Sequence, residues 1–189
     1  MEKIILASAS PRRAELLSAI GADFEVHITD ADERVPASLS PSEQVSMIAK
    51  RKCAAVAPLY PENAVLAADT LVSLDGIVLG KPHDEREAMD MLRTLSGRWH
   101  KVFTGVCVMR GGFEACEFCE TSVLFRELTD EKISRYVASG EPMDKAGAYG
   151  IQRLGALLVE KIDGDYFNVV GLPLVLTAKL LKGAGITLL

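Results

Sequence analysis

The stretch from Asn63 to Leu79, NAVLAADTLVSLDGIVL, places the strongest constraint on the fold. Its apolar residues predict a core strand, and Asp75-Gly76 predicts a tight turn into a returning strand. Asp69 interrupts the apolar run where the core strand should continue, and a buried carboxylate is unfavourable unless it is paired, protonated or bound to a metal. Asp69 is therefore either a functional residue at the carboxyl end of a buried strand or a side chain that caps a turn. Its tight apolar flanks favour function.

The rest of the chain alternates between predicted strands and predicted helices. Apolar runs predict further strands over residues 3–8, 23–28 and 156–162, and a hairpin whose arms, 102–110 and 113–125, are joined by Gly111-Gly112. Cap signals and apolar periodicity predict helices over residues 11–21, 41–56, 84 to about 96, 129–139 and 172–182. We expect loops over residues 29–39, 140–155 and 163–170. This pattern predicts an α/β protein with a mixed sheet.

Length and charge limit the classes of function. With 189 residues the chain is long enough for one sizeable core, and we expect residues 1–189 to form a single domain, at most with a smaller lobe. A hydrophobic content of 49% and a charged content of 25% are typical of a soluble globular protein. The net charge of -5 argues against binding to nucleic acids or to anionic membranes. No segment approaches the roughly 18 consecutive apolar residues of a membrane span, so we expect a cytoplasmic protein.

Two arginines occupy an unusual place at the first predicted helix. Ser10 followed by Pro11 is typical of a helix start, which puts Arg12 and Arg13 in the first turn. That end of a helix is electropositive, and each cation there is unfavourable by a few tenths of a kcal/mol, up to about 1. The arrangement is tolerable if an anion occupies the helix start, where free backbone N–H groups also point. The sequence therefore predicts a phosphate site without a P-loop.

Two lysines lie at the edges of predicted elements. Lys52 shares the edge of the buried stripe of the helix over residues 41–56, because it follows Val45 and Ile48 at helical spacing. Its side chain either snorkels to solvent, which is the usual case, or reaches an anion beside the sheet. Lys81, in Gly80-Lys81-Pro82, lies on a short loop after a strand, which is a weak signal by itself.

The predicted loop over residues 29–39 adds carboxylates to the candidate site residues. Asp30-Ala31-Asp32-Glu33 offers oxygen ligands for a hard cation such as magnesium, although an acidic loop alone is more often simply solvated. Together with the arginines, the lysines and Asp69, these groups are the parts needed to bind a polyphosphate with a divalent metal. The cations neutralise phosphate charge, and a carboxylate orients or deprotonates a water molecule.

Other chemistries have weaker support in the sequence. Walker A, dinucleotide-binding and nucleophile-elbow motifs are absent, and the three histidines lack metal-ligand spacing. Cys116 and Cys119 form a C-x-x-C inside a predicted strand. A two-residue turn at Gly111-Gly112 would set Cys107 opposite Cys116, and strand alternation would turn Cys119 to the other face. This register favours buried reduced thiols over a zinc or redox site.

Several tracts, taken together, resemble the Maf family of nucleoside triphosphate pyrophosphatases. The resemblance runs over nearly the whole chain, and the order and spacing of the tracts make it specific. The tracts are Ser8 to Arg13 (SASPRR), Asp32-Glu33, Lys52, Ala67 to Thr70 (AADT), Gly80 to Pro82 (GKP), Gly147 to Gln152 (GAYGIQ) and Gly164 to Pro173 (GDYFNVVGLP).

The resemblance implies hydrolysis of a nucleoside triphosphate between its α and β phosphates, which gives the monophosphate and pyrophosphate with a divalent cation such as magnesium or manganese. It also implies a fold like that of inosine triphosphate pyrophosphatases, in which an elongated mixed sheet is flanked by helices. The substrate would lie in a central cleft between two lobes, and the protein would often be a homodimer. A second interpretation, motivated by the family's description as septum-formation inhibitors, is a regulator of cell division that senses nucleotide without hydrolysing it.

The family pattern assigns four catalytic positions. By resemblance, Asp69 is the catalytic carboxylate that activates water, and Glu33 is a metal-site or catalytic acid. Glu33 and Asp69 are accordingly the residues expected to hold the metal. Lys52 and Lys81 correspond to phosphate-binding residues that stabilise the transition state.

The same pattern assigns five positions to the substrate. Ser8 and Arg13 correspond to contacts with the triphosphate. Arg12, Thr70 and Gln152 fall at positions that discriminate the base. Their identities are similar to the subgroup that favours dTTP and UTP, and differ from the one that favours a methylated guanosine triphosphate. The amide of Gln152 offers both a donor and an acceptor, which suits a pyrimidine edge, and modified pyrimidine triphosphates would also fit.

Overall fold

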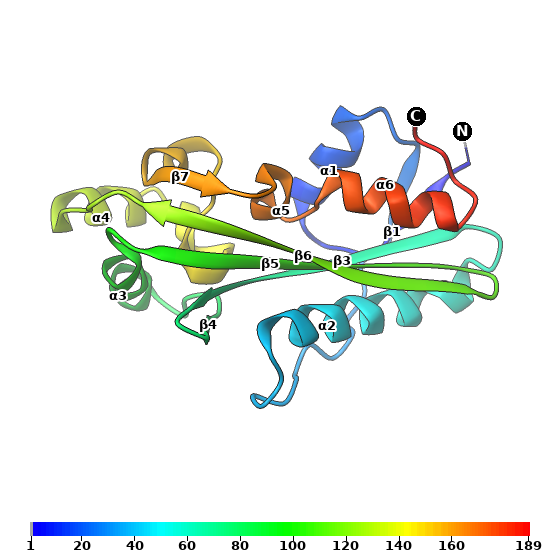
Figure 1. The fold of residues 1–189 in the computed structure, drawn as a ribbon, viewed down its shortest axis with the longest axis horizontal. Coiled ribbons are helices and arrows are strands. Elements are labelled where there is room, and N and C mark those ends of the chain that lie inside the picture. The colour runs from blue at the N-terminus through cyan, green and yellow to red at the C-terminus, as the bar shows by residue number, and fades with distance from the viewer. Residues whose placement is uncertain (1) are drawn as a thin grey trace.

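A mixed β-sheet forms the framework of the molecule (Figure 1). The computed structural model describes residues 2–189. The strands are β1 (Ile4–Leu6), β2 (Phe24–Val26), β3 (Ala64–Leu74), β4 (Ile77–Leu79), β5 (Trp99–Arg110), β6 (Phe113–Phe125) and β7 (Val159–Asp163). Within the described residues they form one seven-stranded sheet in the order β2-β1-β3-β5-β6-β7, with β4 paired to β3 off this path. β1 runs parallel to β2 and β3, and the other pairs are antiparallel.

Helices cover both faces of this sheet. They are α1 (Pro11–Ala19), α2 (Pro41–Val56), α3 (Glu85–Leu95), α4 (Asp130–Val137), α5 (Tyr166–Val170) and α6 (Leu174–Gly183). Short 3₁₀ turns are η1 (Ala57–Leu59), η2 (Glu141–Asp144), η3 (Ala146–Ala148) and η4 (Arg153–Leu157). Helix α2 lies on one face, α1, α5 and α6 lie on the other, and α3 and α4 gather at the far end (Figure 1). None of the helices between residues 2 and 189 has the length and apolar character needed to cross a membrane.

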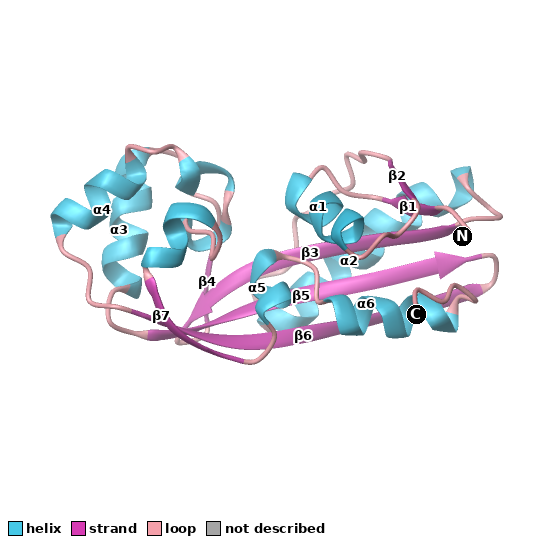
Figure 2. Cartoon of the chain, turned by 90° about the horizontal axis from the view of Figure 1, so that it is seen from above, coloured by secondary structure: helices cyan, strands magenta, loops and turns pink. Residues whose placement is uncertain are grey.

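Two of the hydrophobic cores lie toward the two ends of the elongated sheet, and Figure 2 shows the helices gathered at those two ends. The first joins β1 and the start of β3 to α1 and α6, and it includes the fully buried Leu6 and Leu66. The second joins α3 and α4 to the other ends of β3, β5 and β6, and it includes the fully buried Leu92 and Phe125. The three long strands β3, β5 and β6 contribute to both cores, so they hold the two ends of the molecule in one frame.

The long strand β3 changes its neighbour along its length. β1 pairs with its first residues, 64–66, and β4 pairs with its last, 72–74. Between them, residues 67–71 pair with β5 on one side and with none of the described strands on the other. Asp69 and Thr70 are half-buried in a strand that is otherwise buried. The interrupted pairing therefore brings two polar residues to an open edge in the middle of the sheet.

Helix α2 packs very close to the sheet beside this edge. It starts with a capping box, in which Ser40 and Glu43 bind each other's backbone N–H groups. A Cβ atom on Gly105 of β5 would lie only 2.5 Å from the carbonyl carbon and oxygen of Val45 in α2. Only glycine permits this approach, so Gly105 sets the height of α2 above the sheet.

The structure confirms the predicted fold class, an α/β protein with an elongated mixed sheet flanked by helices. The helix over residues 41–56 has the predicted bounds, and both predicted tight turns, at Asp75-Gly76 and Gly111-Gly112, join antiparallel strands. The loop over residues 29–39 is confirmed as irregular. These segments were predictable because their signals are local to the chain.

Most predicted ends lie within two residues of the observed ones, and three expected boundaries are wrong by three residues or more. Residues 163–170 were expected to form a loop, but Asp165 accepts a 2.7 Å hydrogen bond from the Phe167 N–H and starts the short helix α5. β7 begins at Val159 instead of residue 156, because η4 takes up residues 153–157. β5 begins at Trp99, three residues before the predicted start, because its pairing with β6 extends that far.

We expect the substitution Gly105→Ala to destabilise the fold by about 1–3 kcal/mol, because the added methyl group would collide with the backbone of α2. The same change at Gly112, where a Cβ atom would meet nothing within 4 Å, should change the free energy of unfolding by much less. Chemical denaturation of both variants would measure the difference. Equal stability of the two variants would contradict the close packing of α2.

We expect stability to fall below neutral pH because of one buried histidine. His100 is 2% exposed, its Nε2 lies 2.7 Å from the Tyr149 hydroxyl, and burial lowers its pKa to about 4. The unfolded chain binds a proton near pH 6.5, so protonation favours unfolding between pH 6.5 and 4 and removes up to about 3 kcal/mol. Unfolding titrations should show that His100→Gln has a smaller pH dependence than the wild type. The exposed His83→Gln is the control, and identical pH profiles for all three proteins would contradict the assignment.

Candidate active site

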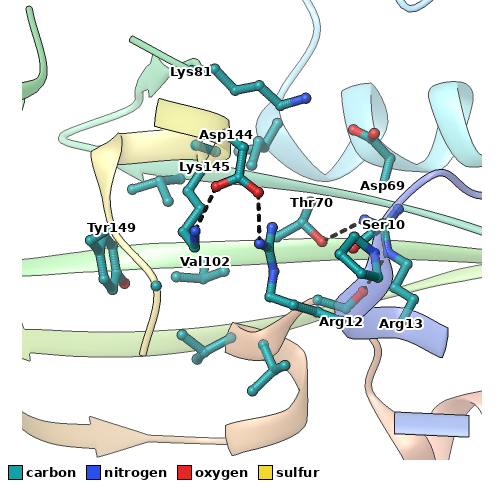
Figure 3. Close-up of a pocket in the computed structure, with 18 of the residues that line it drawn as sticks. Ser10, Arg12, Arg13, Asp69, Thr70, Lys81, Val102, Asp144, Lys145 and Tyr149 are labelled. Carbon is teal, nitrogen blue, oxygen red and sulfur yellow. Dashed lines mark hydrogen bonds and ion pairs between the residues drawn. The ribbon is translucent and has the colours of Figure 1, made fainter. Parts of the chain in front are cut away.

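All nine residues singled out from the sequence line one cavity of about 870 Å³ between the two ends of the molecule. They come from α1, α2, β3 and the loops around them, which are far apart in the chain. The nine are Ser8, Arg12, Arg13, Glu33, Lys52, Asp69, Thr70, Lys81 and Gln152. Figure 3 shows how several of these side chains converge on the cavity.

The open edge of β3 lets two neighbouring residues serve the same cavity from opposite faces of the sheet. Asp69 points toward α2, where its Oδ1 accepts a 2.7 Å hydrogen bond from Lys52 Nζ. Thr70 points toward α1, where its hydroxyl oxygen accepts a 3.1 Å hydrogen bond from Arg13 Nη2. Consecutive strand residues face opposite sides, so both reach one pocket only because no strand covers this edge.

Lys52 bridges two carboxylates. Its Nζ lies 2.7 Å from both Glu33 Oε1 and Asp69 Oδ1, and its side chain is only 11% exposed. Lys52 is therefore turned toward anions beside the sheet and does not snorkel to solvent. Burial raises the pKa of Glu33, but the hydrogen bond and charge of Lys52, helped by Lys81 and Arg13, outweigh it and leave this pKa below its usual value. Glu33 is therefore ionised at neutral pH.

The loop over residues 29–39 carries Asp32 and Glu33 side by side, and of these two only Glu33 contacts Lys52. Asp32 turns to Arg34 through two side-chain hydrogen bonds, of 2.9 and 3.0 Å, which lower the pKa of Asp32 to about 2. Arg51 of α2 donates hydrogen bonds to the carbonyl oxygens of Asp32 and Arg34, at 3.2 and 2.7 Å. It thereby ties the loop to α2 and presents Glu33 to the pocket.

Arg13 is a buried cation without a carboxylate partner in direct contact among the described residues. It is 8% exposed, and it donates to the carbonyl of Gly171 (2.9 Å), to the Ser8 hydroxyl (3.1 Å) and to the Thr70 hydroxyl. Burial lowers its pKa, and Asp69 and Glu33 partly offset this effect. A guanidinium stays charged at any ordinary pH, so its uncompensated charge makes this side of the pocket attractive to an anion.

The start of α1 adds free donors next to Arg13. Ser10 is the N-cap residue, as predicted, but its side chain makes no capping hydrogen bond. The hydroxyl of Ser8 instead accepts from the Ser10 N–H at 3.2 Å. Backbone N–H groups of the first turn are thus left for a ligand, as an anion site at a helix start requires.

The hydroxyl of Thr70 belongs to a chain of hydrogen bonds that leads to the buried Thr104. Thr104 Oγ1 donates to the carbonyl of Asn168 at 3.0 Å, so the 2.9 Å bond between the two threonine hydroxyls must be donated by Thr70. Since Thr70 also accepts from Arg13, its donor and one acceptor position are occupied. Thr70 therefore helps to hold the guanidinium group of Arg13 in place.

The opposite wall of the pocket comes from η2, η3 and the segment after them. Arg12 Nη1 lies 3.0 Å from Asp144 Oδ2, and Lys145 Nζ lies 2.5 Å from Asp144 Oδ1. The carbonyl of Gly80 accepts a 2.9 Å hydrogen bond from the N–H of Gly147, which ties the loop bearing Lys81 to this wall. Among the described residues, Lys81 has no ion-pair partner and Gln152 has no side-chain hydrogen bond, so both are available to a ligand.

Sequence reasoning missed three residues: Asp144 and Lys145, which line the pocket, and Asn168, which lies behind it. Asp144 and Lys145 lie in a segment expected to be an irregular loop, and nothing local marks their approach to Arg12. Asn168 is 0% exposed, and its amide binds the carbonyl of Val102 at 3.0 Å. The sequence offered one signal for Asn168: it is a polar residue between apolar neighbours in the tract from Gly164 to Pro173.

The carboxylates of the pocket suit a hard divalent cation that takes most of its oxygen ligands from water and from a bound phosphate compound. No group of three or more His, Cys, Asp or Glu side chains placed for a metal occurs within residues 2–189. Glu33 and Asp69 converge on Lys52, so the protein offers two carboxylates. Magnesium typically takes one or two carboxylates and completes its shell with waters and phosphate oxygens, so this pair fits such an ion.

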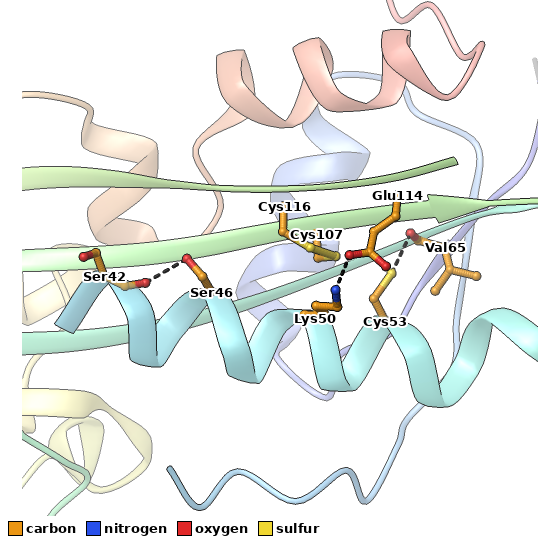
Figure 4. Close-up of a disulfide and its surroundings, with 8 residues drawn as sticks. All are labelled: Ser42, Ser46, Lys50, Cys53, Val65, Cys107, Glu114 and Cys116. Carbon is orange, nitrogen blue, oxygen red and sulfur yellow. Dashed lines mark hydrogen bonds and ion pairs between the residues drawn. A yellow bond between two sulfur atoms is a disulfide. The ribbon is translucent and has the colours of Figure 1, made fainter. Parts of the chain in front are cut away.

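None of the four cysteines lines the pocket. Figure 4 shows Cys107 and Cys116 on neighbouring strands, with Cys53 on α2 beside them. The predicted register is confirmed, with Cys107 opposite Cys116. The expectation of reduced thiols is wrong for this pair, because the register brings their Cα atoms to 4.1 Å and the two sulfurs form a disulfide. Cys53 and Cys119 are free, and the buried Cys53 thiol donates to the carbonyl of Val65 at 3.1 Å.

Comparisons with known proteins identify the family to which the chain is similar. The family model described as Maf-like protein matches residues 3–184. The chain is 47% identical over 187 residues to the dTTP/UTP pyrophosphatase of Bacillus pumilus (strain SAFR-032), covering 99% of both chains. It is 52% identical over 185 residues to that of Symbiobacterium thermophilum, covering 98% of this chain and 95% of the relative. Among solved structures, a HAM1 protein from Coxiella burnetii is 14% identical with a TM-score of 0.47, covering 96% of this chain and 100% of the other.

Proposed function

The chain belongs to the Maf family, and from this membership and the geometry of its pocket we propose that it is a nucleoside triphosphate pyrophosphatase that hydrolyses dTTP and UTP. The products are the nucleoside monophosphate and pyrophosphate. One observation carries the proposal: Lys52 holds Asp69 and Glu33 at 2.7 Å each, at an open strand edge beside the unpaired charge of Arg13. Relatives about half identical to this chain over nearly its whole length bear the name dTTP/UTP pyrophosphatase.

The triphosphate binds where positive charge is available. Arg13 is bonded only to neutral acceptors, Lys81 extends into the pocket, and the start of α1 presents free backbone N–H groups. Ser8 holds Arg13 in place and lies at the same helix start. These donors neutralise the charge that spreads over the phosphate oxygens as the bond to the leaving group breaks.

Asp69 activates the attacking water. Its Oδ1 is occupied by Lys52, and the described residues place no hydrogen-bond donor on Oδ2, so Oδ2 is free to accept a proton. The water oxygen forms a bond to the α-phosphorus, and its proton passes to Asp69. The bond from the α-phosphorus to the oxygen that bridges to the β-phosphate breaks, and that oxygen leaves with the electron pair as part of pyrophosphate.

Lys52 holds the two carboxylates in alignment, and its hydrogen bond and charge keep Glu33 ionised. Glu33 and Asp69 would hold a divalent cation, magnesium or manganese, together with phosphate oxygens of the substrate. When bound, the cation would supply charge neutralisation on the phosphates and lower the pKa of a nearby water. Glu33, whose pKa already lies below its usual value, stays charged for this purpose across the neutral range.

The base lies at the other end of the pocket, toward Arg12 and Gln152. The amide of Gln152 matches the donor and acceptor pattern of a pyrimidine edge. Thr70 contributes by holding Arg13, since its hydroxyl is already engaged with Arg13 and Thr104. Modified pyrimidine triphosphates with the same edge would also be substrates.

We further propose that residues 1–189 form a single domain with the cleft between its two lobes, because β3, β5 and β6 contribute to both cores. The net charge of -5 disfavours nucleic acid as a partner, so free nucleotides are the substrates. A homodimer in the cytoplasm is the state that the family resemblance supports.

We expect pyrophosphate release from dTTP and UTP with magnesium, and loss of at least about a thousandfold of this activity in Asp69→Asn, because the amide cannot take the proton. A panel of nucleoside triphosphates assayed for pyrophosphate would measure both. Asp163→Asn, outside the pocket lining, is the matched control. If the wild type bound nucleotide without turnover and Asp69→Asn bound it equally, the chain would be a nucleotide sensor and not an enzyme.

We expect the two adjacent arginines to give different defects. Arg13→Ala should lower kcat/KM for all nucleotides alike by about 10–100-fold, and should lower the melting temperature, because it removes a buried charge that joins three elements. Arg12→Ala should mainly reduce the preference for pyrimidines. Kinetics on the same panel, with Arg98→Ala as an exposed control paired to Asp75, would separate the two. The same pattern of defects in both variants would contradict this division.

A further inference from the structure

Arg12 and Arg13 are neighbours in the first turn of α1, yet they reach different parts of the molecule (Figure 3). Arg13 turns inward to Gly171, Ser8 and Thr70. Arg12 crosses the pocket, and its Nη1 donates to Asp144 Oδ2 at 3.0 Å, 132 residues along the chain. This ion pair joins α1 to the opposite wall of the cavity.

Asp144 is held between two cations. One carboxylate oxygen binds Arg12, and the other binds Lys145 Nζ at 2.5 Å. Lys145 is itself fixed, because its Nζ also donates to the carbonyl of Glu141 at 2.6 Å and its side chain is 16% exposed. Burial raises the pKa of Asp144, but the hydrogen bonds from Lys145 and Arg12 outweigh it and keep this pKa below its usual value. Asp144 is therefore a fixed anion at neutral pH.

Unlike Glu33 and Asp69, Asp144 lies apart from the proposed cation site, so its carboxylate would only repel the phosphates of a triphosphate. Its consequence is to neutralise Arg12 while leaving Arg13 and Lys81 free of carboxylate partners in direct contact among the described residues. The phosphates are therefore drawn to the side of Arg13 and Lys81 and away from Arg12. Arg12 keeps its remaining N–H donors for an uncharged part of the substrate.

We propose that Asp144 is a positioning residue that holds Arg12 at the nucleobase end of the pocket and so determines base specificity. The inference rests on the proposed function, and it adds Asp144 as a residue and the match between donors of Arg12 and acceptors of the base as the chemical criterion. A guanidinium offers only donors, which match the 4-carbonyl acceptor of uracil or thymine and oppose the 4-amino donor of cytosine. Asp144 thus favours UTP over CTP through Arg12.

The test is the ratio of kcat/KM for UTP to that for CTP, measured by pyrophosphate release in four proteins: the wild type, Asp144→Asn, Arg12→Ala and the double variant. Asp144→Asn should lower the ratio about tenfold, chiefly through a higher KM for UTP, because the isosteric amide no longer anchors Arg12 by charge. The double variant should equal Arg12→Ala, since Asp144 acts through Arg12. Asp130→Asn, which breaks a similar 2.7 Å pair with Arg93 outside the pocket lining, should leave the ratio unchanged.

Two results would overturn the inference: an unchanged ratio in Asp144→Asn, or a further loss of selectivity in the double variant beyond Arg12→Ala. An unchanged ratio with an equal gain of activity toward both nucleotides would mean that the ion pair merely obstructs the pocket. If the wild type released no pyrophosphate, the proposed function would fail, and calorimetric binding of UTP and CTP would still test Asp144. Equal affinity ratios in the wild type and Asp144→Asn, or no binding of either nucleotide, would then reject it.

Discussion

The contact between Lys52 and Asp69 is the interaction on which the rest of the site depends. A carboxylate in a buried strand and a lysine on the buried side of a helix are each unfavourable alone, so the two elements are stable together only where these side chains meet. Gly105 allows this meeting, because its missing side chain lets the backbone of α2 come down onto β5. Glu33 then reaches the same ammonium group from a loop that Arg51 ties to α2. The packing that stabilises the fold is therefore also what assembles the proposed catalytic group.

The pocket exists because the sheet is incomplete at one place. β1 stops pairing with β3 at Leu66, and β4 starts pairing with it at Val72. The stretch of β3 between them has an open edge, which side chains from both faces of the sheet can reach. A continuous neighbour would bury Asp69 and Thr70 on opposite sides of the sheet and separate them. At an open edge, α2 supplies a cation to one of them and α1 supplies a cation to the other. A short β1 is thus a functional feature of the fold.

Local signals in the sequence predicted most of this architecture, and contacts between distant segments account for what was missed. The capping box at Ser40 and the turn at Asp75-Gly76 act within a few residues, so their elements were predicted with the correct bounds. The helical stripe also placed Lys52 correctly at the edge of the buried face. Asp144 meets Arg12 only through the folding of two ends of the chain together, and no spacing along the sequence records that meeting. Likewise the hairpin register set Cys107 opposite Cys116, but a register gives the position of two thiols and not their oxidation state.

Four of the cations that line the pocket were predicted from the sequence, and their partners, more than the cations themselves, determine where a polyanion can bind. Lys52 is satisfied by two carboxylates and Arg12 by one, so neither has a full charge to offer. Arg13 has only neutral acceptors, and Lys81 has no ion-pair partner in the part of the chain that the structure describes, so their charge is directed into the cavity. The same distinction explains how two arginines are tolerated at the start of α1. Asp144 compensates the charge of Arg12. Arg13 is held by neutral groups, so its charge is left for an anionic ligand.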